Sequence, residues 1–394
     1  MLHRHPFAGG EHDCAPEGVT KRGSLVKLKK TQTAMLSIAL TATLALAACG
    51  GDDEDTPEPA GSASAPAAAE VSGTIAGAGS SAQGSAMEAW IAGFTEANPD
   101  ATVTYDPAGS GAGRTQFTEG GVQFAGSDAY LKPEEVTKAQ EQCGGDFVEF
   151  PGYISPIAVA YNLPGVEDLK LSASVIAKIF DGKITKWNDP AIAGLNSGTT
   201  LPDSNITPVH RSDESGTTQN FTDYLHKAAP ADWTYDAAQE WPVSGGEGAN
   251  GTSGVAETLK GGEGTIGYLD ASRATDLGVA HIQVGSEFVE YTPEAAAAVV
   301  DAGKTVSGRP QYSFAIDIPR DTTEAGVYPI VLVSYTLACT KYDDQATADT
   351  VKAYLTYVVS EEGQAAAAEN AGSAPISDTQ RTNALKGIAA IGVA

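Results

Sequence analysis

The pattern of apolar and polar positions along the chain predicts alternating strands and helices separated by short turns. Three short runs of alternating apolar residues indicate strands, at 71–75, 101–105 and 122–126. Residues 85–96 have an apolar face at helical spacing, which includes Trp90 and Phe94. This repetition of strand, turn and helix is typical of an α/β fold with a mainly parallel sheet.

A long apolar run at 147–162 contains Pro151 and Pro156, and it predicts an extended segment that crosses between two lobes. Later apolar runs predict two buried strands, at 264–268 and 328–335. Amphipathic spacing predicts three more helices, at 173–180, 217–227 and 345–359. The chain contains no internal sequence repeat.

The first 48 residues have the pattern of an export signal. Basic residues between 21 and 30 precede an apolar run at 35–46, which is too short for a permanent transmembrane helix. The run leads into Leu46-Ala47-Ala48-Cys49-Gly50, which resembles the lipobox of bacterial lipoproteins, so we expect Cys49 to be lipidated. An ordinary secretory signal with an incidental Cys is the alternative. Residues 1–20 resemble no targeting element, and a mis-assigned start is a hypothesis that N-terminal sequencing of the precursor would test.

Residues 49–70 are acidic and then rich in Pro, Ala and Ser, which predicts a lipidated, flexible tether. The whole chain has 394 residues, 42% of them apolar, so it can bury a large core and form two or three domains. Its formal net charge is −26, which argues against a nucleic-acid partner. Cleavage before Cys49 would remove six basic and three acidic residues and leave a net charge of −29.

The mature chain after cleavage keeps Cys49, Cys143 and Cys339. If Cys49 carries a lipid, two cysteines remain that could pair. Outside the cytoplasm, Cys143 and Cys339 are expected to form a disulfide, and two separate buried thiols are the alternative.

Three turns rich in Gly, Ser or Thr each follow a predicted strand and open a predicted helix: 79–82, 109–111 and 213–217. Unpaired N–H groups and the positive end of the helix dipole make such turns suitable for anions. N-capping explains any single one of them. Three together, with one Arg and one Asp nearby, predict an anion-binding site.

The two charged residues are Arg211 and Asp128. The guanidinium of Arg211 matches a tetrahedral oxyanion, although a structural ion pair with Asp213 is the alternative. A carboxylate repels anions unless the anion carries a proton, so Asp128 favours protonated phosphate over sulfate. A helix cap or a surface acid is the alternative for Asp128.

Several segments together resemble the phosphate-binding lipoproteins of bacterial ABC transporters, which are similar to type II periplasmic binding proteins. The resemblance covers roughly 71–394, and the segments that carry it include GAGSSAQGSAMEAW (77–90), VQFAGSDAYL (122–131) and HRSDESGTTQNF (210–221). It implies a two-lobed α/β fold with the ligand in the cleft between lobes. The implied lobes are 71–155 with 325–394, and 156–324.

The resemblance also implies a set of phosphate-binding residues. These are Ser81, Ala82, Ser110, Asp128, Arg211, Ser215, Gly216 and Thr217. The first loop has Ser81-Ala82 where the family often has Thr-Phe, so a hydroxyl is kept and an aromatic side chain is lost from the cleft wall.

The implied protein is a monomer without cofactor or metal that is anchored to the outer face of the cell membrane. It would bind inorganic phosphate and deliver it to ABC permease subunits. A binder of another oxyanion, such as sulfate or molybdate, is an alternative. A secreted phosphatase is a weaker alternative, because the three His residues of the mature chain, His210, His226 and His281, are too scattered for a metal-hydrolase motif. The GxGxxA pattern at 77–82 fits a nucleotide binder only formally.

Overall fold

The computed structural model of the protein describes residues 71–394. The predicted export signal, Cys49 and the tether lie outside these residues. Within 71–394 the main feature is a nine-stranded sheet with the order β2-β1-β3-β14-β4-β8-β6-β7, in which β9 also pairs with β4. Its strands are β1 (Gly73–Gly79), β2 (Ala101–Asp106), β3 (Phe124–Ser127), β4 (Phe147–Asn162), β6 (Thr207–Arg211), β7 (Glu247–Ala249), β8 (Thr265–Asp270), β9 (Gly278–Val279) and β14 (Val331–Cys339).

Strand directions differ between the ends and the middle of this sheet. The pairs β1–β2, β1–β3, β6–β7 and β6–β8 are parallel, whereas β14 and β4 run antiparallel to their neighbours. The expected α/β class with parallel strands is therefore confirmed. The remaining short strands are β5 (Lys170–Leu171), β10 (His281–Val284), β11 (Glu287–Val289), β12 (Lys304–Thr305), β13 (Ile316–Asp317), β15 (Lys341–Tyr342) and β16 (Gly392–Val393).

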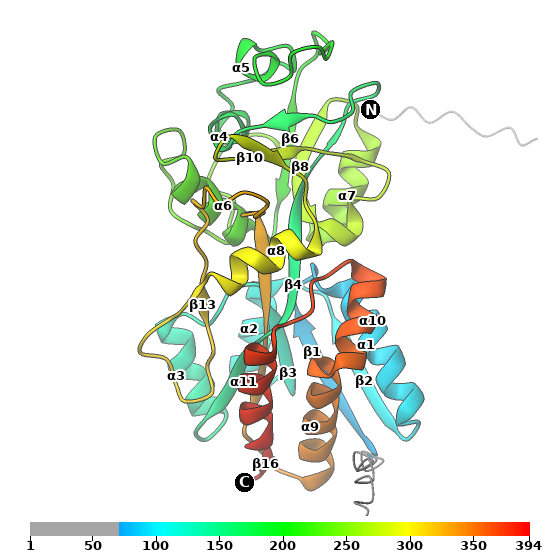
Figure 1. Ribbon diagram of the computed structural model, residues 1–394. Helices are drawn as coiled ribbons and strands as arrows, with labels where there is room; N and C mark the ends of the chain where they lie inside the picture. The colour runs from blue at the N-terminus through cyan, green and yellow to red at the C-terminus, as the bar shows by residue number, and fades with distance from the viewer. Residues whose placement is uncertain (1–70) are drawn as a thin grey trace, which may run out of the picture. The chain divides into compact units, whose positions relative to one another are not determined.

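The long strand β4 connects two halves of the sheet. Its residues 147–156 pair with β14, and its residues 157–162 pair with β8. We call β2, β1, β3 and β14 the first half and β8, β6 and β7 the second half; Figure 1 shows β4 running between them. The extended strand predicted at 147–162 is thus found with the predicted bounds.

Helices cover both halves. They are α1 (Gly84–Ala97), α2 (Ser110–Thr118), α3 (Pro133–Gln142), α4 (Ala173–Phe180), α5 (Pro190–Ala193), α6 (Gly216–Ala228), α7 (Gly251–Gly261), α8 (Pro293–Asp301), α9 (Gln345–Val359), α10 (Glu361–Ala371) and α11 (Asp378–Ala389). As the apolar pattern predicts, α1 buries Trp90 and Phe94, and the indole N–H of Trp90 donates to the carbonyl of Gly363 at 2.8 Å. Figure 1 shows α1 beside α10 and α9 beside α11.

Cys143 and Cys339 form the expected disulfide, which joins the end of α3 to the end of β14. The alternative of two separate thiols is therefore wrong. No helix among residues 71–394 combines the length and apolar character that a membrane span requires.

Candidate anion-binding site

The three turns predicted from the sequence lie at the carboxyl ends of strands, each before a helix. β1 ends at Gly79 before α1, β2 ends at Asp106 before α2, and β6 ends at Arg211 before α6. Within each half of the sheet, the carboxyl ends of the parallel strands lie at one edge, where ligands commonly bind. The strands of the second half run opposite to those of the first, so the carboxyl ends of the two halves face each other near the middle of β4. The turns after β1 and β2 come from the first half of the sheet, and the turn after β6 comes from the second half.

Asp128 follows β3 and is the centre of the contacts between the two halves. Its side chain is 3% exposed, so the alternative of a surface acid is wrong, and it caps none of the helices between 71 and 394. The hydroxyl of Thr217 donates to Asp128 Oδ2 at 3.2 Å. The backbone N–H of Asp128 donates to the Oγ of Ser110 at 3.1 Å. These bonds bring the turns before α2 and α6 together at one residue, through its backbone N–H and its carboxyl group.

The Asp128 carboxyl also accepts a hydrogen bond from the hydroxyl of Ser334 in the middle of β14. Burial raises the pKa of Asp128 above its usual value, although the hydroxyls around it and the charge of Arg211 act in the opposite direction. A buried carboxyl with a raised pKa readily shares a proton. It is therefore suited to a ligand that brings a proton.

Arg211, at the end of β6, is 3% exposed and forms an ion pair with Asp213. Its Nε donates to Asp213 Oδ1 at 2.7 Å. Burial by itself would raise the pKa of Asp213, but the guanidinium holds that pKa below its usual value. The ion pair considered as an alternative is therefore present, and it orients the guanidinium without excluding a ligand from its remaining N–H groups.

Ser81 is hydrogen-bonded to the N-terminus of helix α7. Its Oγ accepts a hydrogen bond from the backbone N–H of Thr252 at 3.1 Å and lies 3.1 Å from the hydroxyl of Thr252. The neighbouring N–H of Gly251 donates to Asp213 Oδ1 at 3.1 Å. The N–H of Ala82, by contrast, donates to the Oγ of Ser80 at 3.1 Å, so it is engaged within its own turn.

Ser215 and Gly216 begin helix α6. The hydroxyl of Ser215 caps the helix by accepting from the N–H of Thr218 at 3.1 Å. A Cβ on Gly216 would lie 2.6 Å from the Cβ of Asp128 and 2.6 Å from the Oγ of Ser110. Only glycine permits this close approach of the two halves.

The structure therefore gathers most of the sequence-predicted residues into a largely buried cluster, whereas the N–H of Ala82 is bonded within its own turn. Ser110, Asp128, Gly216 and Thr217 are in direct contact, and the N-terminus of α7 links Ser81 to the Arg211–Asp213 pair. Hydroxyls, helix N-termini and one guanidinium provide the donors, and one carboxyl provides an acceptor. Such a set can bind a tetrahedral anion that carries a proton.

Two residues of the cluster were not predicted. Ser334 lies in a run of apolar residues, so the pattern indicates only a core strand. Thr252 follows Asn250-Gly251 after the three-residue strand β7, and this turn has the same composition as the three that were recognised. Its similarity to those turns is the signal that could have identified it.

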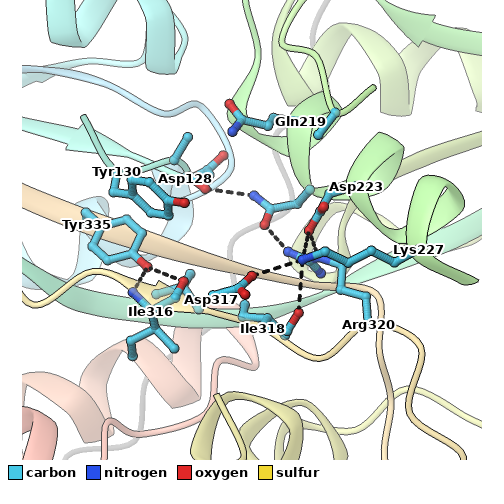
Figure 2. A pocket seen from close by; sticks show the side chains of 14 residues that line it. Asp128, Tyr130, Gln219, Asp223, Lys227, Ile316, Asp317, Ile318, Arg320 and Tyr335 are labelled. Carbon is cyan, nitrogen blue, oxygen red and sulfur yellow. Dashed lines mark hydrogen bonds and ion pairs between the residues drawn. The ribbon is translucent and has the colours of Figure 1, made fainter. Parts of the chain in front are cut away.

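A cavity of about 180 Å³ lies beside Asp128, between α6 and the segment around β13. Figure 2 shows Asp128 and Tyr130 on one side of it and Asp223, Lys227 and Arg320 on the other. Among residues 71–394, no group of three or more His, Cys, Asp or Glu side chains is arranged to hold a metal ion.

Comparison with known proteins identifies relatives over most of the chain. The family model described as "PBP superfamily domain" matches residues 64–362. "Phosphate-binding protein PstS 3" of Mycobacterium leprae is 38% identical over 315 residues, which are 78% of this chain and 84% of the relative. "Phosphate-binding protein PstS 2" of Mycobacterium tuberculosis is 38% identical over 289 residues, 70% of this chain and 76% of the relative.

A solved structure has the same fold. The phosphate-binding protein from Stenotrophomonas maltophilia matches with a TM-score of 0.64 and 19% sequence identity, over 80% of this chain and 94% of that protein.

Proposed function

The chain belongs to the PstS family of phosphate-binding proteins, and from this premise we propose that it captures inorganic phosphate outside the cytoplasm for a phosphate ABC transporter. It is a binding protein and not an enzyme. The observation that carries the proposal is the buried Asp128 carboxyl, which lies among hydroxyl groups and close to the Arg211–Asp213 pair.

The proposed phosphate ligands are Ser81, Ala82, Ser110, Asp128, Arg211, Ser215, Gly216 and Thr217. Hydroxyls, backbone N–H groups and the Arg211 guanidinium would donate to the phosphate oxygens, and Asp128 would accept the hydrogen bond of the protonated oxygen. Sulfate has no such proton at neutral pH, so its oxygen would face a desolvated carboxylate. The N–H of Ala82 would have to exchange its bond to Ser80 for one to phosphate.

Two lobes, 71–155 with 325–394 and 156–324, are proposed to close around the ligand. The change of partner along β4, from β14 to β8 after residue 156, supports a hinge at this point. The contacts of Thr217 with Asp128 and of Thr252 with Ser81 would then be contacts between lobes.

Titration calorimetry with phosphate and sulfate tests the proposed ligand. We expect the phosphate-depleted protein to bind phosphate and to reject sulfate. Asp128→Asn should raise the Kd for phosphate by about 10–100-fold, because a hydrogen bond to a charged group is lost, and it should bind sulfate more tightly than the wild type. The exposed Asp106→Asn is the control at the end of β2. Failure of the wild type to bind phosphate would contradict the proposal, and tighter binding of sulfate or molybdate would favour another oxyanion.

The lipid anchor and the permease partner are further parts of the proposal. The sequence around Cys49 supports lipidation, and the resemblance to the phosphate-binding lipoproteins of bacterial ABC transporters supports an extracytoplasmic protein that acts with permease subunits. Cys49→Ala should move the protein from the membrane fraction to the soluble fraction of cells that express the full chain. An unchanged membrane fraction would contradict the anchor.

A further inference from the structure

Arg320 is a buried arginine outside the predicted ligand set, and its contacts extend toward that set. It follows β13 and is 2% exposed. Its Nη1 donates to the carbonyl oxygens of Pro329 at 3.1 Å and Val331 at 2.8 Å, where the chain enters β14. Its Nε donates to Asp223 Oδ2 at 2.8 Å. The guanidinium is thus bonded both to the start of a central strand and to helix α6, and these bonds fix the relative position of the two elements.

The remaining contact of Arg320 is with Asn220 on α6. The Nη2 of Arg320 donates to Asn220 Oδ1. The amide Nδ2 of Asn220 donates to two backbone carbonyl oxygens, that of Asp128 at 2.7 Å and that of Gly216 at 2.8 Å. Because the guanidinium only donates and both carbonyls only accept, the amide has a single satisfactory orientation.

Asn220 therefore connects two segments that carry proposed phosphate ligands. Asp128 belongs to the first half of the sheet and Gly216 to the second, and both backbone carbonyls receive a hydrogen from the same amide group. Asn220 is 8% exposed, so water competes little for these bonds. A chain of hydrogen bonds thus leads from the start of β14 through Arg320 and Asn220 to the backbone of Asp128.

On the basis of the proposed phosphate binding, we propose that Asn220 and Arg320 are positioning residues for the ligand site. Asn220 holds the backbone of Asp128 against the N-terminus of α6, and Arg320 acts through Asn220 by fixing the orientation of its amide. In Figure 2, Arg320 and Asp223 lie across the cavity from Asp128, and the hydrogen bonds of Asn220 link Arg320 to the Asp128 backbone.

Asn220→Asp is the sharpest test, because the new side chain has the same shape and keeps an oxygen for Arg320. It replaces the amide donor by an oxygen that faces two carbonyl oxygens. We expect the Kd for phosphate to rise by about 10–100-fold, since a donor is lost and a repulsion is gained. The increase should appear mainly in the dissociation rate, because the lost bond joins the two halves once they are together.

Gln219→Glu is the matched control. It places the same charge one residue earlier on α6, and its oxygen keeps the hydrogen bond that Gln219 Oε1 accepts from Gln239 at 2.7 Å. We expect its phosphate Kd to stay within about twofold of the wild type. Equal affinities for Asn220→Asp and Gln219→Glu would overturn the positioning role. A wild type without phosphate affinity would overturn the proposed function instead.

A second variant tests whether Arg320 acts through Asn220 and keeps the proposal falsifiable if Asn220→Asp folds poorly. Lysine in place of Arg320 retains a charge for Asp223 but lacks the planar fork. We expect Arg320→Lys to weaken phosphate binding severalfold in the wild type and to have little effect in an Asn220→Ala background. Equal losses in both backgrounds would overturn the coupling between the two residues.

Discussion

At the scale of single residues, burial gives two aspartates unusual environments. Asp128 lies in the proposed ligand site, whereas Asp270 lies outside it, at the end of β8 opposite Ile157 of the crossing strand β4. Asp270 is fully buried and accepts from the hydroxyl of Tyr153 at 3.1 Å and from the N–H of Ser272 at 3.0 Å. Burial raises the pKa of Asp270 to about 6 despite these donors.

The raised pKa of Asp270 predicts how stability depends on pH. The folded protein keeps this proton up to about pH 6, whereas the unfolded chain loses it near its ordinary pKa of about 3.9. The contribution of Asp270 to the free energy of unfolding is therefore complete below about pH 4 and falls by about 3 kcal/mol between about pH 4 and pH 6, above which it stays lost. Asp270→Asn should remove this slope in denaturant titrations at several pH values. Parallel profiles for variant and wild type would contradict the prediction.

Residue types near the site were predictable where several polar signals coincided. Asp128 follows a strand, and no helix begins directly after it. Its role in anion binding was therefore predicted together with the turns rich in Gly and Ser, and not from its own position. Ser334 could not be predicted, because a single hydroxyl in an apolar strand has no local pattern and its partner is 206 residues away. Its contact with Asp128 exists only through the tertiary fold.

At the scale of elements, helix α6 and the turn before α2 meet where Gly216 has no side chain. The φ of Gly216 lies outside the left-handed region, so alanine fits its backbone. What alanine would disturb is the contact with Asp128 and Ser110 in the other half of the sheet.

Gly216→Ala should therefore weaken phosphate binding without unfolding the protein. The added methyl would displace the segments that meet in the site, at a cost of about 1–3 kcal/mol, or about a 5–150-fold increase in Kd. Gly254→Ala, in the first turn of α7, is the control, because its nearest neighbour would be the Cβ of Ala249 at 3.7 Å. Calorimetric titration and thermal unfolding measure the two effects. Similar phosphate affinities for the two variants would contradict a role for the contact at Gly216 in phosphate binding.

Three strongly patterned elements were predicted with correct bounds, whereas the strand predicted at 328–335 lies at Val331–Cys339, and weakly patterned elements were missed. The helices at 173–180 and 345–359 and the strand at 147–162 agree with the structure residue for residue. Helix α7 was missed, because it begins with Gly-Thr-Ser-Gly and its apolar face is short. Helix α10 has mainly alanine on its buried side, so its packing against α1 leaves little periodic signal.

At the scale of the whole molecule, the net negative charge of the protein repels the anion that it is proposed to bind. The full chain has a net charge of −26, yet its proposed ligand is an anion. The long-range field should slow the approach of phosphate, and the buried donors act only at short range.

We therefore expect the association rate for phosphate to rise with salt. The screening length falls from about 30 Å at 0.01 M to about 10 Å at 0.1 M ionic strength, which weakens the repulsion. The dissociation rate should change little, because the proposed contacts are buried. Stopped-flow measurements at several concentrations of sodium chloride would separate the two rates. An association rate that falls with salt would instead indicate a locally positive entrance.

The central position of β14 has a consequence for the order in which the protein can assemble. This strand lies between β3 and β4, yet it is synthesised almost 170 residues after β4 ends. Because the chain is synthesised from its N-terminus, the place of β14 in the middle of the sheet stays empty until residues 331–339 have been made. The native disulfide of Cys143 likewise cannot form until Cys339, 196 residues later, has been made. Assembly of this protein is therefore a late event that requires nearly the entire polypeptide.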